Sequence, residues 1–226
     1  MVEEKRWLSK SQIQLFLQCP LKWRSVYIDE IPSPPSPQQE RGIQIHKKIE
    51  EFYKNIEIIQ EQGKQIIKLK TEDVDLKNFV ELEQSRIKDC VDEKGEYDKS
   101  YFEPVFQELK LTNPQLMLRG IIDAVYLHPK DKKAIIIDWK TGKFYPWNLD
   151  DYRFELAFYK ELFEKDRRID IEVGYWGIFF TDANRLFFEK VEQKHIDRMY
   201  KVVEKVREEM ESGIYPCKCG RCKNVI

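Results

Sequence analysis

The sequence predicts a mixed α/β fold with a central mixed β-sheet flanked by helices. Helical patterns fill the first part of the chain, and strand patterns then alternate with two further helices. The 226 residues are 42% hydrophobic and 13% aromatic, which supplies enough apolar material for the core of one domain. This is not the composition of a disordered chain.

The N-terminal region is expected to begin with a short helix. Ser9 and Gln12 have the spacing of a capping box, and Pro20 follows the last apolar residue of the pattern. The proline-rich segment Ile31–Glu40 is expected to be a loop. A second helix is predicted over about Gly42–Ile59, where isoleucine and phenylalanine recur at helical spacing, and residues 60–100 are expected to be helical in part.

A change of period marks the predicted sheet. Val105–Leu111, Leu116–Leu127 and Lys133–Trp139 have strand patterns, and His128–Lys133 is a turn that makes the last two a hairpin.

The C-terminal half continues with helix, hairpin and helix. Asp150–Glu164 is predicted to be a helix, and residues 173–180 and 185–191 form a second hairpin. Glu192–Glu211 has apolar residues in steps of three and four, and Gly213 is placed to cap that helix.

The charge balance excludes a globally basic protein. Lys and Arg number 39 against 40 Asp and Glu, for a net charge of −1, so a nucleic-acid site must be a local patch. No stretch is long and apolar enough for a membrane span, and the first residues lack a secretory signal. A cytoplasmic protein is expected, in which the five cysteines are metal ligands or unliganded rather than disulfide-bonded.

Two aspartates and a lysine lie in the first predicted hairpin. Asp138 and Lys140 share a strand face, and the turn can bring Asp123 across from Asp138. Neighbouring carboxylates repel one another unless a cation lies between them, and oxygen ligands favour Mg²⁺ or Mn²⁺. The alternative is a solvated surface hairpin in which Lys140 pairs with an aspartate. The apolar run Ile135–Ile137 favours a buried strand.

These residues resemble a known motif. "GIID…IIIDWKTGK" looks like the motif of the PD-(D/E)XK nucleases, in particular the RecB-like branch. The segment around His46 resembles that branch's metal-binding G-x-x-x-H helix, and "ELAFY", Glu155 to Tyr159, resembles its Q-x-x-x-Y helix. The N-terminal Ser…Cys-Pro pattern and the terminal cysteines also match. The chain is most similar to the CRISPR-associated RecB-like exonucleases and the AddB nuclease domain, which implies a restriction-endonuclease-like core.

The resemblance implies roles for the site. His46, Asp123, Asp138 and the Trp139 carbonyl are expected to bind Mg²⁺ or Mn²⁺, and Lys140 to orient the attacking water and stabilise developing charge. The catalytic set is Asp123, Asp138, Lys140, Glu155 and Tyr159.

Two acidic residues have open roles. Glu155 replaces the glutamine of the family pattern, and it is expected either to bind a second cation or to accept a bond from Lys140. Glu108 is either a support for the metal or a solvated strand carboxylate.

The terminal cysteines predict a second metal centre. Cys217, Cys219 and Cys222 supply three thiolates, and Cys19 is the natural fourth. One cysteine early in the sequence and three near its end resemble the ligand arrangement of the iron–sulfur RecB-like nucleases, which favours a [4Fe–4S] cluster over zinc. The third alternative is that these cysteines bind no metal. Cys90 is left as a buried or bystander thiol.

The sequence therefore predicts a metal-dependent DNA nuclease, expected to be an exonuclease on single strands or DNA ends. One nuclease domain is expected over residues 1–226, with a core at about 41–191 and an iron–sulfur clasp from 9–24 and 192–226. The alternatives are a catalytically silent DNA-binding or assembly subunit of a repair or CRISPR adaptation complex, and a zinc-bearing interaction module.

Single basic residues near the motifs are candidates for contacts to DNA phosphates, and the alternative is that they are ordinary solvated side chains. They are Lys22, Arg24, Arg119, Lys143 and Arg153. Trp23, Tyr145 and Trp147 are candidates for stacking on unpaired bases, or else core and rim residues.

Overall fold

A five-stranded mixed sheet forms the centre of the protein. The computed structural model describes residues 6–32, 34–69, 76–220 and 222. The strand order is β3-β4-β5-β6-β7, in which only β5 and β6 run parallel. The strands are β3 (Phe106–Asn113), β4 (Leu118–Leu127), β5 (Ala134–Lys140), β6 (Val173–Phe180) and β7 (Arg185–Lys190). The predicted fold class is confirmed.

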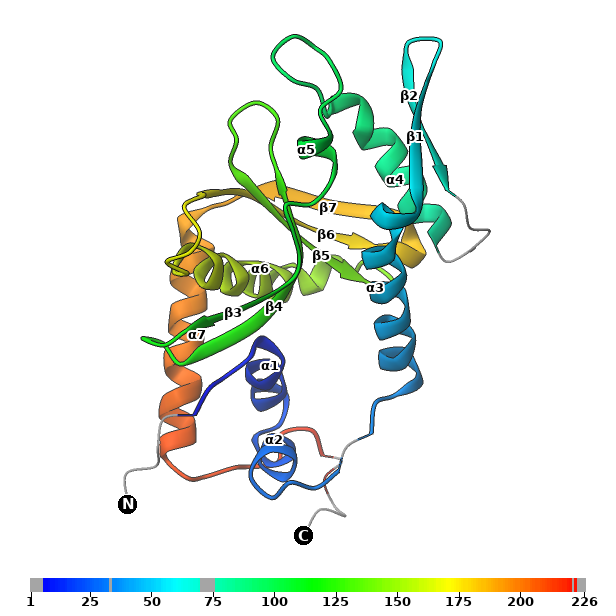
Figure 1. The fold of residues 1–226 in the computed structure, drawn as a ribbon. Coiled ribbons are helices and arrows are strands. Elements are labelled where there is room, and N and C mark those ends of the chain that lie inside the picture. Colours follow the sequence, from blue (N-terminus) through cyan, green and yellow to red (C-terminus); the bar gives the residue numbers. More distant parts are fainter. Residues whose placement is uncertain (1–5, 33, 70–75, 221, 223–226) are drawn as a thin grey trace.

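Helix α6 (Leu149–Glu164) makes the one parallel pairing possible. Parallel neighbours cannot be joined by a tight turn, and α6 is the crossover that carries the chain from β5 to β6. It packs on one face of the sheet together with α7 (Gln193–Glu211), as Figure 1 shows. The core on this face includes Phe158, Leu162 and Trp176.

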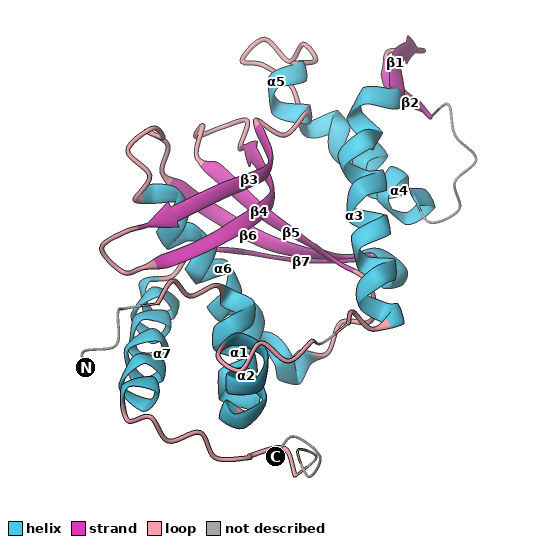
Figure 2. Cartoon of the chain, turned by 60° about the horizontal axis from the view of Figure 1, so that its bottom comes forward, coloured by secondary structure: helices cyan, strands magenta, loops and turns pink. Residues whose placement is uncertain are grey.

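A second core covers the opposite face. Helix α3 (Pro37–Asn55) contributes Ile45, Ile49 and Phe52, which pack with Trp139 and with residues of α4 (Lys77–Arg86). Figure 2 shows α3 and α4 on the side of the sheet away from α7. Because β5 alternates its side chains, Ile136 faces the first core while Ile137 and Trp139 face the second.

The N-terminal helices α1 (Lys10–Gln18) and α2 (Pro20–Tyr27) meet at Cys19. The predicted start of the first helix is confirmed, because the Ser9 side chain accepts from the Gln12 backbone N–H at 3.3 Å. Pro20 starts α2, since a proline needs no hydrogen-bond donor in the first turn. Leu8, Ile13 and Phe16 join the core formed by α6 and α7.

The predicted boundaries of the next helix were wrong at both ends. Helix α3 starts at Pro37 rather than Gly42, because Ser36 and Gln39 form a full capping box that turns the end of the proline-rich segment into a helix start. It stops at Asn55, and Ile56 onward forms strand β1 (Ile56–Glu61), paired with β2 (Lys64–Leu69).

Residues 60–100 are helical in part, as expected, but also contain β2. Besides α4, they hold a short 3-10 helix at Ile87–Asp89 and the start of α5 (Lys99–Phe102). Positions 70–75 of this segment lie outside the described residues.

The remaining predicted elements are confirmed to within three residues at each end. Asn184 in the left-handed conformation ends the turn between β6 and β7, and Gly213, at φ 66°, follows α7. Single 3-10 turns lie at Pro146–Asn148 and Thr181–Ala183. Within the described ranges, no helix combines the length and the apolar character needed to cross a bilayer.

Candidate active site and cysteine cluster

The site lies where β4 and β5 separate. Their ladder ends at the pair Ala124 and Ile137, so Asp123 and Asp138 are the next two residues along the diverging strands. Asp123 Oδ2 accepts the Trp139 backbone N–H at 2.7 Å. The Asp123 carboxylate thus accepts a hydrogen bond from a buried backbone N–H that has no partner in the β4–β5 ladder. Both aspartates are buried.

Three side chains from three elements converge on this point. His46 on α3, Glu108 on β3 and Asp123 on β4 each offer a ligand atom, and these atoms lie within 4.8 Å of one another. His46 Nδ1 is 3.5 Å from Asp123 Oδ1, and Nε2 donates to the Trp139 carbonyl at 2.6 Å. Glu108 has a positive φ of 47°, which interrupts the regular alternation of β3 beside Asp123.

The charges of this group depend on one another. Burial lowers the pKa of His46, but the hydrogen bond and charge of Asp123 outweigh it and raise that pKa to about 9. Burial, with the charge of Asp123, raises the pKa of Glu108. In the absence of a metal, Asp123 therefore favours the protonated form of the His46 imidazole.

A second group lies on the α6 side of β5. Lys140 Nζ is 2.6 Å from Asp138 Oδ2 and donates to Glu155 Oε1 on α6 at 3.0 Å. Glu155 also forms an ion pair with Lys10 at the start of α1. Two ammonium groups and two carboxylates thus balance one another in a buried cluster, as buried charges require.

The two carboxylates of this cluster differ in pKa. Burial and the charge of Glu155 raise the pKa of Asp138 to about 7. Burial also disfavours the charge of Glu155, but Lys140 and Lys10 prevail and lower its pKa to about 2. For Lys140, Asp138 and Glu155 outweigh burial and raise the pKa, so the side chain stays an ammonium.

The structure brings together most of the residues expected at the site. His46, Asp123 and the Trp139 carbonyl lie together, whereas Asp138 lies outside the tight group and pairs with Lys140. Glu155 accepts a bond from Lys140, one of the two roles considered for it.

Tyr159 lies one turn after Glu155 on α6. It is buried, and burial with the charges of Asp138 and Glu155 raises its pKa well above the usual value.

Sequence reasoning missed Lys10 and gave Glu108 only as an alternative. Neither belongs to the hairpin pattern, since Lys10 reaches the site from a helix 145 residues before Glu155 in the chain. A lysine directly after the capping serine was the only available signal.

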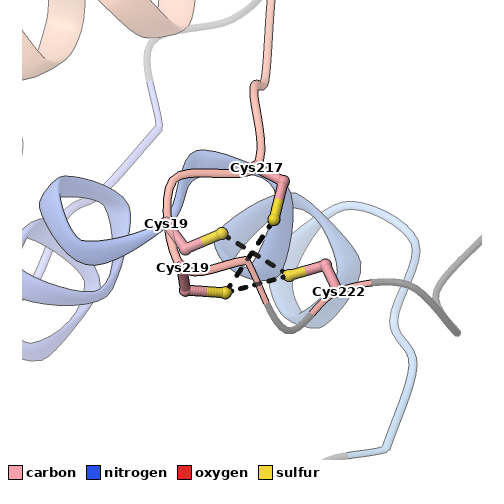
Figure 3. A group of neighbouring side chains, drawn as sticks. All are labelled: Cys19, Cys217, Cys219 and Cys222. Carbon is pink, nitrogen blue, oxygen red and sulfur yellow. Dashed lines mark hydrogen bonds between the residues drawn. The ribbon is translucent and has the colours of Figure 1, made fainter.

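The four predicted cysteines form a compact group. Cys19 Sγ lies 3.5 Å from Cys222 Sγ, Cys219 lies 3.3 Å from Cys222, and Cys217 lies 3.9 Å from Cys219. Figure 3 shows the sulfurs pointing toward one another, with Cys19 from the junction of α1 and α2 and the other three from the C-terminal segment. Four thiols at this spacing have the composition of a soft-metal site.

Cys19 is prepared for ligation by its position. Burial raises its pKa, but backbone N–H groups of Lys22, Cys219 and Lys218 outweigh burial and lower it to about 6. The thiolate is the form that binds metal. Cys90 lies apart from the cluster, and burial raises its pKa to about 11.

The candidate DNA contacts are scattered. Arg153 is held by two hydrogen bonds to Glu189 at 2.9 and 2.8 Å, and Arg24 pairs with Asp29 at 3.4 Å. Lys22, Arg119 and Lys143 are exposed.

The aromatic candidates divide into core and surface. Trp23 is a core residue, whereas Trp147 is 77% exposed and lies 5.0 Å from the Tyr145 ring.

Comparisons with known proteins agree with this geometry. The sequence profile of the PD-(D/E)XK nuclease superfamily matches residues 7–224. The chain is similar to the crystal structure of a Eubacterium rectale protein described provisionally as an exonuclease, with a TM-score of 0.54 and 10% identity over 96% of this chain and 86% of that one. It also aligns with the crystal structure of SSO0001, with a TM-score of 0.37 and 14% identity over 92% and 79%. No curated protein sequence matches significantly.

Proposed function

Since the chain belongs to the PD-(D/E)XK nuclease superfamily, we propose that it is a divalent-metal-dependent deoxyribonuclease of the RecB-like branch. The observation that carries the proposal is the convergence of His46, Glu108 and Asp123 beside the Lys140 ammonium. A set of metal ligands and a half-buried ammonium group at one strand fork are what hydrolysis of a phosphodiester needs.

The donor set fits a hard divalent cation. Two carboxylates and an imidazole within 4.8 Å offer the oxygen and nitrogen ligands suited to Mg²⁺ or Mn²⁺. Burial and the charge of Asp123 raise the pKa of Glu108, and a cation here would favour the ionised form of both carboxylates. The Trp139 carbonyl lies at the same place, 2.6 Å from the His46 ring. Asp138 joins this set only when its carboxylate leaves Lys140.

The cation, when bound, supplies polarisation of the scissile phosphate and a lowered pKa for bound water. Lys140 stays charged, so its role is to orient the attacking water and to stabilise negative charge that develops on the phosphate, rather than to act as a base. Glu155 holds the Lys140 Nζ at 3.0 Å and so fixes where that charge points. Tyr159 completes the α6 side of the site as a neutral hydroxyl.

An exonuclease that acts on single strands or DNA ends is the form of the activity we propose. The description of the Eubacterium rectale neighbour as an exonuclease supports it at the level of fold. End-labelled single-stranded and duplex DNA, digested with Mg²⁺ or Mn²⁺, distinguishes stepwise shortening from internal cuts.

The four cysteines are proposed to hold a [4Fe–4S] cluster. The division of the ligands into one and three along the sequence supports this assignment. Neighbouring thiols lie 3.3 to 3.9 Å apart, which is the spacing of thiolates around one tetrahedral ion at ~2.3 Å, so the thiols must move apart to hold a four-iron cluster. Anaerobically purified protein is expected to be brown and to contain about four irons per chain. Colourless protein with one zinc per chain would assign a zinc site instead.

We also propose one nuclease domain across the chain, with a core at about 41–191 and a clasp from 9–24 and 192–226. The packing of α1 and α7 into the same core as α6 supports the single domain.

The deciding experiment compares wild-type protein with Asp138→Ala in a metal-dependent digestion. Cleavage by wild-type protein and its loss in the variant are expected. A wild-type protein that binds DNA without cutting it would identify the silent subunit of a repair or CRISPR adaptation complex.

A further inference from the structure

A groove with cationic side chains lies beside the active site. It has a volume of about 550 Å³ and lies between the start of α1, the β3–β4 ribbon and α6. Lys10, Lys110 and Arg119 line it, and none of its described lining residues is acidic. Although the net charge of the protein is −1, three positively charged side chains therefore lie around one concave surface.

The strand register puts the relevant side chains on one surface. Lys110 pairs with Ile121, and Thr112 pairs with Arg119, so these four residues alternate along one face of the ribbon. All four are exposed. Within residues 6–32, 34–69, 76–220 and 222, the side chains of Lys110 and Arg119 form no ion pair. Two unpaired cations on a neighbouring strand pair are suited to anionic groups of a ligand.

The groove adjoins the site at two places. Lys10 lines the groove, forms an ion pair with Glu155, and borders a second hollow shared with Lys140. On β3, Lys110 lies two residues after Glu108, so both belong to the same short stretch of strand. A chain lying in the groove would therefore pass next to the residues proposed to bind the metal.

The groove also offers apolar contacts. Ile121 is 42% exposed between the cations, and Tyr159 also lines the groove. Proteins that bind single strands combine a basic track for phosphates with apolar and aromatic surfaces for bases. In a duplex the base faces are stacked and unavailable. A groove with a volume in the ~300–1,000 Å³ range of small-ligand pockets admits a few nucleotides of one strand.

We propose that this groove binds the unpaired strand of the substrate, with phosphates at Lys110 and Arg119 and a base against Ile121. The inference rests on the proposed nuclease function. It narrows the substrate from single strands or DNA ends to an unpaired strand, and it names the residues that bind that strand.

The test is a salt titration of binding without cleavage. Fluorescence anisotropy of labelled single-stranded and duplex DNA is measured in EDTA over a series of salt concentrations. Each phosphate contact to a single strand contributes about 0.7 to the slope of log K against log salt. Lys110→Ala with Arg119→Ala is therefore expected to lower that slope by about 1.4 for single strands.

Two further variants distinguish contacts in the groove from a general effect of charge or stability. Ile121→Ala is expected to weaken single-strand binding at every salt concentration without changing the slope, because it removes an uncharged contact. Lys201→Ala removes the same charge from an exposed position on α7 and is expected to change neither quantity. All four substituted positions are exposed, so melting curves should remain those of the wild type.

Three results overturn the assignment. They are an unchanged slope in the double variant, an equal loss in Lys201→Ala, and an equal loss for duplex and single strand. A parallel digestion of DNA by wild-type protein with Mn²⁺ separates this inference from the nuclease proposal. Cleavage with unchanged variant binding rejects the groove alone, and specific binding without cleavage rejects the nuclease activity alone.

Discussion

Glu155 carries the negative charge that Lys10 and Lys140 share. Its replacement by glutamine keeps an oxygen that accepts from Lys140, and the lysine remains balanced by Asp138 at 2.6 Å. Glu155→Gln is therefore expected to keep nuclease activity to within about tenfold, a loss of ~1.4 kcal/mol in transition-state stabilisation. The measurement is kcat on end-labelled DNA with Mn²⁺.

The matched variant for this prediction is Glu155→Leu. It has a similar size but no acceptor, leaves two ammonium groups without their shared partner, and should lose far more activity than Glu155→Gln. If Glu155→Gln abolished metal binding, measured by Mn²⁺ titration, Glu155 would be a metal ligand and its role as an anchor for Lys140 would be wrong.

His46 gives the metal-free protein a defined pH dependence. Its pKa is about 9 in the folded protein and ~6.5 when unfolded, so its protonation stabilises the fold fully below pH ~6.5. That contribution is lost as the pH rises through 9. In EDTA, the Tm of the wild type should therefore fall by several degrees relative to that of a variant without this histidine between pH 7.5 and 9.5, since ~1 kcal/mol moves Tm by ~2–4 °C at this size.

The variant His46→Gln lacks this titration and is the reference for it. The raised pKa of Asp138, about 7, acts in the same direction but at lower pH, whereas the lowered pKa of Cys19, about 6, makes stability rise with pH in the same window. The difference between the wild-type and His46→Gln curves, in which the Cys19 contribution cancels, therefore measures the histidine. An equally steep decline in His46→Gln would assign the pH dependence to another group.

Residue patterns identify the candidate site only where the chain itself keeps the residues close. Asp123, Asp138 and Lys140 could be predicted because one hairpin carries all three and strand alternation fixes their faces. The position of Glu108 depends on a positive φ that no sequence rule required, and Lys10 depends on how α1 packs. Such tertiary contacts leave no periodic signal.

At the scale of the elements, Gly177 on β6 controls how closely β7 packs. A Cβ at this position would lie 2.6 Å from the Phe187 carbonyl oxygen and 3.1 Å from Ile137 Cδ1. The carbonyl belongs to the β6–β7 ladder and cannot move without breaking it. Gly177→Ala is expected to destabilise the fold by ~1–3 kcal/mol, measured as a lower urea midpoint.

Gly42 on α3 provides the same substitution with the opposite expectation. A Cβ there meets only Thr141 Oγ1 at 3.6 Å, an ordinary contact, and alanine is favoured over glycine in a helix by ~0.8–1.0 kcal/mol. Gly42→Ala should raise the urea midpoint. An unchanged midpoint in Gly177→Ala would mean that β7 can shift without loss of pairing.

The elements of the sheet were predictable because strand and turn signals agree along 105–191. The helix prediction failed at Ile56–Ile59, where the apolar residues fit both the end of a helix and the start of a strand. The β1–β2 pairing decides between them, and for these residues that pairing depends on a partner seven or more residues away. Pro37 was taken for a helix breaker, although its position after Ser36 makes it a helix start.

At the scale of the whole molecule, the cysteine cluster and the active site are connected by one helix. Cys19 ends α1 within the cluster, and Lys10 at the other end of α1 holds Glu155. The sequence could pair Cys19 with the C-terminal cysteines by ligand count, but it could not show that the same helix reaches the catalytic group. A metal at the cysteines would fix one end of α1 and thereby the position of Lys10.

This connection predicts that losing the cluster impairs catalysis as well as stability. Cys222→Ser removes a ligand at the end of the chain, far along the sequence from the catalytic residues, and should lose iron and lower Tm. Its kcat should fall while its KM changes little, because Lys10 loses its fixed position beside Glu155 and DNA contacts elsewhere remain. Cys90→Ser is the matched control, since this buried thiol lies outside the cluster and should keep both iron and kcat. A variant that lacks iron yet retains kcat below its Tm would show that α1 is held by its apolar packing alone, through Ile13 and Phe16 in the core.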